Sequence, residues 1–239
     1  MQLFFSNLIQ GKSIILDETE SKHLKVMRLG LNDIIHITDG AGNLYEARLT
    51  DIARGNVCAE IVKITKPQSA NTCRLHIAIA PTKSSERFEW FLEKAAEIGI
   101  DEISPLLCHH SERIKLNTER LQKILVSAIK QSLKTSLPRL NNPVHFVEFI
   151  TKYAEGQKFI ASCMHGDEKE IQCVYTKGSD AVVLIGPEGD FTGEEISSAL
   201  QTGFNAVSLG ESRLRTETAG VYVSALFNIL NSNSKTEGN

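Results

Sequence analysis

Two arginines and two glutamates occupy one short segment between two apolar stretches. In this segment, SLGESRLRTETAG at residues 208–220, Arg213 and Arg215 stand among Glu211, Glu217 and two glycines. A turn needs no more than a Gly or an Asn, so a turn alone does not explain the charges. A guanidinium presents its N–H donors in a fixed planar arrangement that suits an anionic or carbonyl-rich ligand. The residue types therefore predict a binding site at this segment.

A glycine-rich segment earlier in the chain is equally unusual. In LIGPEGDFTGEE, residues 184–195, Gly186 and Gly189 would let the backbone approach a ligand without an intervening side chain. A T-x-x-E spacing near its end predicts a capped helix start. The segment matches neither the dinucleotide-binding motif nor the P-loop motif, and Glu188 would repel a phosphate. It is either a plain strand-to-helix connection or a site for a neutral or cationic ligand.

The elements around these segments alternate between strand and helix. Apolar runs predict strands, and apolar positions three and four residues apart predict helices. The expected strands are residues 74–80, 100–107, 158–163, 181–186 and 205–210, and the expected helices are residues 84–99, 117–134, 192–203 and 218–230. This alternation is typical of a mostly parallel sheet covered by helices. Ligands bind at the carboxyl ends of such strands, so the two segments, which follow consecutive strands, are expected to form one shared site.

The N-terminal region has a different, β-rich pattern. Apolar runs around the sequence TDGAGN, residues 38–43, predict a hairpin, and a second turn is expected at ARGN, residues 53–56. A helix is expected over residues 19–30, ending at Gly30. The polar stretch at residues 66–72 predicts a boundary. We therefore expect a β-rich domain over residues 1–68, an α/β domain over residues 73–231 and a disordered tail over residues 232–239.

The composition favours an intracellular protein. The net charge is -3, and five scattered cysteines form no C-x-x-C pair, which is typical of reduced thiols in the cytoplasm. No apolar run approaches the ~20 residues that a membrane span needs, and the N-terminus lacks the pattern of a secretory leader. His109 and His110 are adjacent, so their side chains diverge and no metal site is expected. The expected location is cytoplasmic, with neither a membrane nor a metal as partner.

The two charged and glycine-rich segments together resemble a known pair of motifs. LIGPEGDFTGEEI followed by SLGESRLRTETAG is similar to the signature of the bacterial 16S ribosomal RNA uridine-N3 methyltransferases, which belong to the SPOUT class. HLKVMRLG and DGAGNLYEARL resemble the N-terminal domain of that family. KSSERFEWFLEKAAEIGIDEISPLL and AIKQSLKTSLPRL resemble its first two catalytic-domain helices, although this chain has Lys130 and Lys134 where the family often has Glu and Arg. The resemblance covers nearly the whole chain.

The resemblance implies a fold class, a cofactor and partners. The implied fold is α/β, with a C-terminal SPOUT-type knotted, mostly parallel sheet that has helices on both faces, and with a small N-terminal PUA-like β-barrel. The implied cofactor is S-adenosyl-L-methionine, and the implied partners are ribosomal RNA or the small ribosomal subunit and a second copy of the chain. The resemblance places the following residues around the cofactor: Met164, Leu184, Ile185, Gly186, Pro187, Glu188, Gly189, Leu209, Gly210, Leu214, Arg215 and Thr216.

Methylation at uridine N3 defines two catalytic tasks. N3 carries a proton at neutral pH, so methyl transfer requires in-line positioning of N3 and stabilisation of the uridine anion. We expect Arg215 to stabilise the anion. Glu217 is a candidate proton acceptor, directly or through water. The alternative is that Glu217 only stabilises the start of the last helix, where negative charge is favourable.

Clusters of basic residues predict contacts with RNA. Between residues 109 and 140 there are seven Lys or Arg and two acids, and phosphate attraction would use this excess. The alternative is a solvated helix face. The candidate RNA-binding residues are Lys22, His23, Lys25 and Arg28 in the first domain and Lys83 and Arg87 in the second.

Other functions remain open at this point. A nucleotide-binding hydrolase or kinase-like enzyme is disfavoured, because no lysine stands in the glycine-rich segment and Glu188 is acidic. A non-catalytic RNA-binding module would have the same fold without the chemistry. A SPOUT methyltransferase that acts on a ribose 2′-hydroxyl or on transfer RNA would share the cofactor and differ in the acceptor atom.

Overall fold

The computed structural model describes residues 1–52, 57–66, 73–152, 155–162 and 168–232. The chain divides into two compact units, of which the first comprises Met1–Gln68 and Leu125–Leu137, and the second comprises Ser69–Ile124 and Pro138–Asn239. Within the described residues, no helix is both long and apolar enough to cross a bilayer. The turn expected at residues 53–56 and all but Ser232 of the expected tail lie outside the described residues.

The first unit is built around one curled sheet. Its strands are β1 (Leu3–Phe5), β2 (Ile9–Gln10), β3 (Ser13–Leu16), β4 (Ile34–Thr38), β5 (Leu44–Ile52) and β6 (Val57–Thr65), in the order β1-β4-β5-β6-β3-β2. Alternate residues of these strands, such as Ile35 and Ile37, point into a core that also takes Leu24 from helix α1 (Glu18–Val26). The hairpin expected around residues 38–43 is confirmed, because β4 and β5 pair antiparallel and Gly40 and Gly42 have φ of 75° and 95°.

Helix α1 ends earlier than its sequence predicts. We expected it to continue to Gly30, but it ends at Val26, and Arg28 adopts the left-handed conformation with φ of 57°. The Arg28 and Leu29 amides donate to the Lys25 and Leu24 carbonyls, at 3.1 and 3.2 Å. This is a Schellman motif, in which a partly buried apolar residue, here Leu29, follows the left-handed one and packs against the core of the unit. The left-handed residue that ends the helix is therefore Arg28, two residues before the glycine.

The second unit contains a parallel sheet. Its strands are β7 (Leu75–Ile79), β8 (Glu102–Leu107), β9 (Arg139–Leu140), β10 (Val144–His145), β11 (Gln157–Ala161), β12 (Ala181–Ile185) and β13 (Asn205–Val207). The order is β10-β8-β7-β12-β11-β13, β9 pairs with β8, and all of these pairings are parallel. The predicted fold class is confirmed in these features. The knot stays a prediction. The chain between β11 and Glu170, which pairs with Ser208, includes residues 163–167, and these lie outside the described residues.

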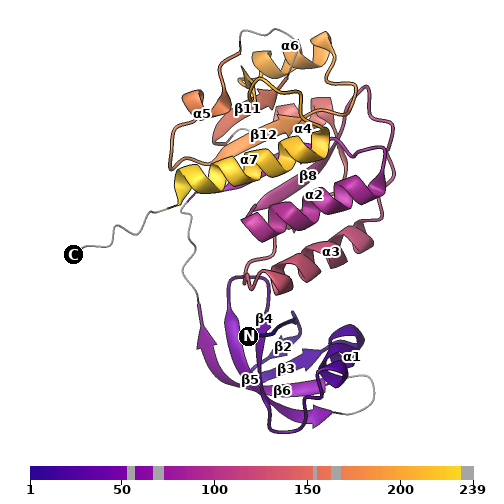
Figure 1. Cartoon of the computed structure of the whole chain (residues 1–239), viewed down its shortest axis with the longest axis vertical. Coiled ribbons are helices and arrows are strands. Elements are labelled where there is room, and N and C mark those ends of the chain that lie inside the picture. The colour runs from indigo at the N-terminus through magenta and orange to yellow at the C-terminus, as the bar shows by residue number, and fades with distance from the viewer. Residues whose placement is uncertain (53–56, 67–72, 153–154, 163–167, 233–239) are drawn as a thin grey trace, which may run out of the picture. The chain divides into compact units, whose positions relative to one another are not determined.

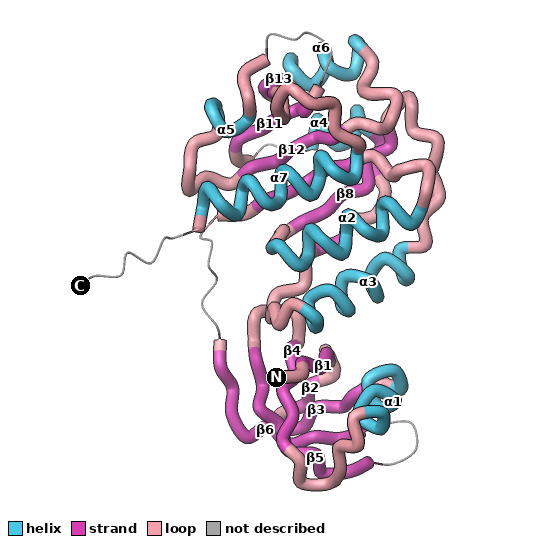
Figure 2. The backbone as a smooth tube through the Cα atoms, viewed as in Figure 1, coloured by secondary structure: helices cyan, strands magenta, loops and turns pink. Residues whose placement is uncertain are grey.

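Helices cover both faces of this sheet (Figures 1 and 2). On one face, α2 (Ser85–Ile98) packs beside α7 (Thr216–Asn231), which also contacts β7 and β12. On the other face, α4 (Phe146–Lys152) and α6 (Gly193–Gln201) contact each other over a core that includes Ala78, Leu184 and Phe149. Successive strand residues point to opposite faces, so Ala78 faces this core whereas Ile79 faces α7. The remaining helices are α3 (Thr118–Gln131) and α5 (Ile171–Val174).

Gly220 allows α7 to approach α2 closely. A Cβ atom at position 220 would lie 2.6 Å from Cδ2 of Phe91, which is fully buried, and 3.0 Å from Cδ1 of Ile79. We predict that Gly220→Ala lowers the free energy of unfolding by about 1–3 kcal/mol, because the added methyl group overpacks this contact. Urea denaturation followed by circular dichroism measures the change.

A matched control for this substitution is Gly193→Ala at the start of α6. A Cβ at position 193 meets nothing within 4 Å, so alanine there is expected to be neutral or to stabilise by up to ~1 kcal/mol through its helix propensity. If the two variants are equally stable, close packing of α7 on α2 does not depend on glycine at position 220.

Candidate functional site

Loops follow the carboxyl ends of several parallel strands. They span residues 80–84 after β7, 108–117 after β8, 186–192 after β12 and 208–215 after β13. Because the strands are parallel, these loops begin at one edge of the sheet, which is where ligands bind in such folds. The charged and glycine-rich segments supply two of these loops.

The two loops do not follow neighbouring strands, contrary to our expectation from the sequence. β11 lies between β12 and β13 and pairs with both. The loops nevertheless meet, because the Thr216 hydroxyl donates a buried hydrogen bond to the Gly186 carbonyl at 3.0 Å. Thr216 is the first residue of α7 and is itself buried. The start of α7 therefore brings the loop at residues 208–215 to the end of β12.

The loop at residues 186–192 is held by other parts of the second unit. The Glu188 carboxylate accepts a hydrogen bond from the Lys83 amide at 3.1 Å, so it joins this loop to the loop after β7. A Cβ at Gly186 would lie 3.1 Å from the Phe191 ring, and a Cβ at Gly189 would lie 3.2 Å from His110 Cβ. Both glycines therefore meet a packing requirement within the protein, which glycine spacing alone does not reveal.

The apolar residues predicted around the cofactor differ in accessibility. Leu184 and Ile185 are 0% and 3% exposed, and the Ile185 carbonyl accepts a hydrogen bond from the Ala80 amide at 2.9 Å, so both residues support the loop from within the protein and present almost no surface to a ligand. Leu209 and Leu214 are half-buried, and Gly210 has φ of 111°. Met164 lies outside the described residues. Among the described residues, the accessible apolar side chains of the predicted set therefore belong to the loop after β13.

Arg215 combines exposure with a fixed position. It is the N-cap residue of α7, its side chain makes no capping hydrogen bond, and its carbonyl accepts from the Ala219 amide at 2.8 Å. The side chains of Arg213 and Arg215 are both exposed, and neither forms an ion pair with another described residue. The backbone of Arg215 is thus held by the helix while its guanidinium is available to a ligand.

Glu217 is a buried carboxylate with an unsatisfied oxygen. The residue is 6% exposed, and its Oε1 lies 3.8 Å from Arg87 Nε. Its Oε2 has no hydrogen-bond partner among the described residues. A buried, incompletely paired carboxylate is costly and occurs mainly where it has a role. Stabilisation of the start of α7 does not require this burial.

Adjacent histidines and the glycine-rich loop are connected by hydrogen bonds. The His109 amide donates to Glu195 Oε1 at 2.8 Å, and His110 Nδ1 lies 3.0 Å from the Asp190 carbonyl. Glu195 also completes the predicted capping box with Thr192, which is confirmed. The hydrogen bonds of His109 and His110 therefore hold the loop at residues 108–117 against the loop after β12. Among the described residues, no group of three or more side chains is arranged to hold a metal ion.

The six predicted RNA-binding residues fall in two places. In the first unit, Lys22 pairs with Glu18 at 2.8 Å, the His23 ring packs 5.4 Å from that of Phe4, and Lys25 and Arg28 are exposed. In the second unit, Lys83 Nζ lies 2.9 Å from Glu112 and Arg87 approaches Glu217.

The basic excess between residues 109 and 140 is smaller in the structure than in the sequence. Arg120 pairs with Glu89 at 2.8 Å, Lys123 with Glu119 at 2.7 Å and Lys130 with Glu20 at 2.5 Å. Two of these acids come from distant parts of the sequence, so counting charges within the segment missed them. Arg113 and Lys115, in the loop at residues 108–117, do not form ion pairs with other described residues.

Comparison with known proteins identifies relatives over nearly the whole chain. The model of the RNA methyltransferase domain family matches residues 69–228, and the model of the RNA methyltransferase PUA domain matches residues 16–62. The Synechocystis protein named ribosomal RNA small subunit methyltransferase E is 33% identical over 86% of this chain and 69% of its own length.

Two solved structures support the same kinship. The probable rRNA-methyltransferase from Porphyromonas gingivalis is 38% identical, with a TM-score of 0.90 over 97% of this chain and 98% of that one. The ribosomal RNA small subunit methyltransferase E from Neisseria gonorrhoeae, bound to S-adenosyl methionine, is 28% identical, with a TM-score of 0.81 over 96% of this chain and 98% of that one.

Proposed function

Since the chain belongs to the RNA methyltransferase family, we propose that it methylates N3 of a uridine in 16S ribosomal RNA, with S-adenosylmethionine as methyl donor. The names of its relatives support the substrate, and the relative with bound S-adenosyl methionine supports the cofactor. The observation that carries the proposal for this chain is the hydrogen bond between Thr216 and Gly186, which joins the two motif-bearing loops at the ligand-binding edge of the sheet.

The chemistry of these loops fits the proposed cofactor. Bound S-adenosylmethionine supplies an electrophilic methyl group on a positively charged sulfonium. The half-buried Leu209 and Leu214 offer apolar surface to an adenosine, and the open surroundings of Gly210 leave room for it. The proposed cofactor residues are those implied by the resemblance, and among them Leu184 and Ile185 form the buried strand end that supports the loop at residues 186–192.

Arg215 is the proposed stabiliser of the uridine anion. As N3 loses its proton, negative charge spreads onto the two carbonyl oxygens of the base, and a guanidinium can donate two N–H bonds to one of them. The helix start holds the Arg215 backbone in place, and its side chain forms no ion pair with another described residue that it would have to leave.

Glu217 is the proposed acceptor of the N3 proton. We predict that Glu217→Gln lowers kcat about 10²-fold, which is at the low end for loss of a general base, and leaves the Kd of S-adenosylmethionine unchanged. The kcat of the variant should continue to rise with pH, because hydroxide then removes the proton. Glu211→Gln, an exposed carboxylate of the same loop, is the matched control. An unchanged kcat in Glu217→Gln would mean that Glu217 does not accept the proton and only stabilises the start of α7.

The two predicted domains divide the proposed task. Residues 1–68 would bind RNA through Lys22, His23, Lys25 and Arg28, and residues 73–231 would bind the cofactor and approach the RNA with Lys83 and Arg87. The exposure of Lys25 and Arg28 supports this assignment. Action on ribosomal RNA would place the protein in the cytoplasm.

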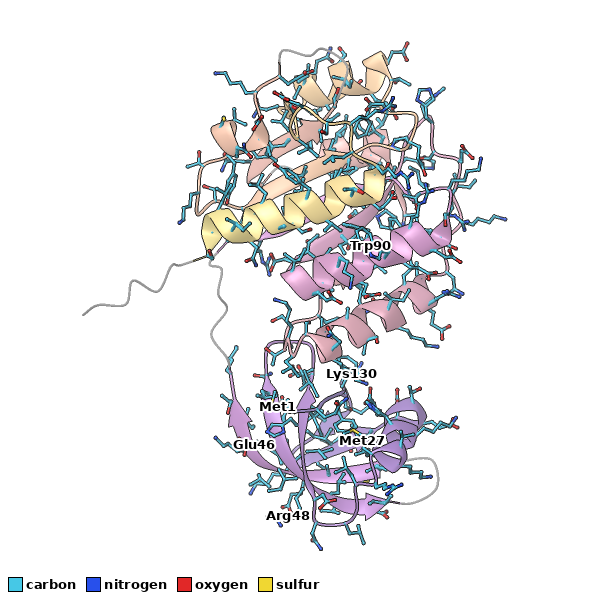
Figure 3. The ribbon with its side chains drawn as sticks, viewed as in Figure 1. Met1, Met27, Glu46, Arg48, Trp90 and Lys130 are labelled. Carbon is cyan, nitrogen blue, oxygen red and sulfur yellow. The ribbon has the colours of Figure 1, made fainter. Side chains whose placement is uncertain are left out.

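A homodimer is part of the proposal. On the face of the sheet that carries α2 and α7, Ile229 is 70% exposed and Trp90, labelled in Figure 3, is 42% exposed. The proposal predicts that an interface with a second copy of the chain covers this face. Light scattering over a range of protein concentrations tests this part, and a monomer at all concentrations would contradict it.

Two measurements test the function as a whole. Calorimetric titration should show micromolar or tighter binding of S-adenosylmethionine. Small ribosomal subunits that lack the modification, incubated with the protein and cofactor, should yield 3-methyluridine on nucleoside mass spectrometry. A 2′-O-methylated nucleoside, or activity on transfer RNA alone, would replace the N3 assignment, and cofactor binding without any methylated product would favour a non-catalytic RNA-binding role.

A further inference from the structure

A surface cavity lies beside the candidate site, between residues that follow β7 and the loop at residues 108–117. Its volume is ≈ 320 Å³, and Lys83, Glu112, Arg113, Ile114 and Lys115 line it. It is a shallow hollow open to solvent, which suits an extended strand better than an enclosed small ligand. Of the lining residues, the proposed function uses only Lys83.

The cavity lining is basic on balance, with three cations and one carboxylate. Lys115 is exposed and forms no ion pair with another described residue. The Lys83–Glu112 pair is open to solvent, with side chains that are 74% and 58% exposed. Such exposed pairs are weak, so a phosphate can replace Glu112 as the partner of Lys83.

Arg113 and Ile114 give the cavity a fixed wall and an apolar surface. Arg113 donates from Nε and Nη2 to the Lys83 carbonyl, at 3.2 and 2.9 Å, and so holds the loop at residues 108–117 against the loop after β7. Ile114 is 60% exposed. Ammonium groups beside an exposed aliphatic side chain suit a ligand that is anionic on one side and apolar on the other, as a nucleotide is.

A second cavity continues from the first. Its volume is ≈ 260 Å³, it shares Arg113 with the first cavity, and it is also lined by Arg120 and Glu89, which form an ion pair at 2.8 Å. We call the two cavities together the substrate track, defined by Lys83, Arg113, Ile114, Lys115 and Arg120.

The substrate track begins directly beside the proposed cofactor loop. The Lys83 amide donates to Glu188 of that loop at 3.1 Å. Arg87, four residues further along the chain, approaches Glu217 at 3.8 Å. An RNA strand whose target base occupied the proposed site would therefore pass Lys83 and continue along the substrate track.

We propose that the substrate track binds the single-stranded RNA segment adjacent to the target uridine. Lys83 and Lys115 bind a backbone phosphate, and Ile114 packs against the sugar or base of the same nucleotide. Arg113 holds the loop at residues 108–117 against the loop after β7. Contacts of this kind hold the backbone without selecting a base sequence. This inference rests on the proposed function and specifies where its RNA substrate binds.

The test is RNA binding by Lys115→Ala in the full-length protein, measured by fluorescence anisotropy with a labelled oligouridine. Loss of one phosphate contact should weaken binding about three- to tenfold near 0.1 M salt and reduce the slope of log K against log salt by about 0.7. Lys115→Glu should weaken binding further. In kinetic assays on ribosomal subunits, KM should rise while kcat changes little.

The matched control is Lys123→Ala. Lys123 is also an exposed lysine close in sequence, but it lies on α3, pairs with Glu119 and does not line either cavity. Its affinity for oligouridine and its salt slope should equal those of the unmodified protein. If Lys115→Ala retains the full affinity and salt slope, or loses no more affinity than Lys123→Ala, the substrate track does not bind the RNA and the proposal is wrong.

The binding assay also separates this inference from the proposed function. It contains no methyl donor, so a failure of methyl transfer does not affect it. A protein that methylates ribosomal RNA, and whose Lys115→Ala variant binds oligouridine normally, contradicts the track alone. A protein that binds S-adenosylmethionine but yields no methylated RNA contradicts the function, whatever the affinity of Lys115→Ala.

Discussion

Replacement of Arg215 by alanine is expected to lower kcat for methyl transfer by about 10²–10³, the usual effect of removing one group that stabilises developing negative charge. The Kd values of S-adenosylmethionine and of RNA should change much less than kcat, because the charge that Arg215 stabilises develops only as N3 loses its proton. Single-turnover kinetics with saturating cofactor and ribosomal subunits measure the change.

Arg213→Ala is the control for this substitution. Arg213 lies two residues earlier in the same loop, and like Arg215 it is exposed and has no ion pair with a described residue. Its replacement should leave kcat unchanged. Neither substitution should unfold the start of α7, because the Arg215 side chain makes no capping hydrogen bond. A variant Arg215→Ala with normal kcat and weak cofactor binding would instead assign Arg215 to the carboxylate of S-adenosylmethionine.

The two arginines illustrate how far local sequence predicts the site. Residue types and spacing were sufficient to identify both loops, because glycines, a capping box and clustered charges are local features. The same holds for α2, whose Phe88, Phe91 and Leu92 have helical spacing and are all buried, and whose end is the left-handed Gly99 that the pattern predicts.

What the sequence could not predict depends on pairs of distant residues. The Glu188 carboxylate accepts a hydrogen bond from the backbone amide of Lys83, 105 positions away, and no local pattern indicates that partner. The order of strands was also beyond local pattern, since β11 enters the sheet between β12 and β13. Helix α4 was missed although Phe146, Phe149 and Ile150 are buried at helical spacing, because seven residues give too short a period to separate helix from strand.

The role of the Lys130 charge also depends on a distant residue and could not be predicted from the local sequence. In the sequence it contributes to a basic segment, whereas in the first unit its Nζ lies 2.5 Å from Oε1 of Glu20, with side chains that are 16% and 6% exposed (Figure 3 labels Lys130). Oε2 of Glu20 has no hydrogen-bond partner among the described residues. Burial raises the pKa of Glu20, and Lys130 acts against that rise. Lys130 therefore serves to neutralise a buried carboxylate, and it is not available to RNA.

We accordingly expect Lys130→Ala to lower the free energy of unfolding at pH 7 by about 3 kcal/mol, because it leaves the Glu20 carboxylate buried without its cation. A carboxyl group whose pKa is higher in the folded state binds its proton more tightly when folded. Its ionisation therefore destabilises the protein as the pH rises from the unfolded pKa through the folded one. Without Lys130 the folded pKa of Glu20 rises further, so the deficit of the variant should shrink as the pH is lowered towards 5.

Urea denaturation of the full chain at both pH values measures this deficit, and two comparisons decide its cause. Lys123→Ala removes an exposed pair, with side chains that are 74% and 80% exposed, and should cost no more than about 0.5 kcal/mol. Glu20→Gln combined with Lys130→Met removes both charges and should recover most of the stability, since neither charge is then left unpaired. A loss in Lys130→Ala that is the same at pH 5 and pH 7, or that persists in the double variant, would mean that packing of the lysine stem stabilises the first unit and that neutralisation of Glu20 does not.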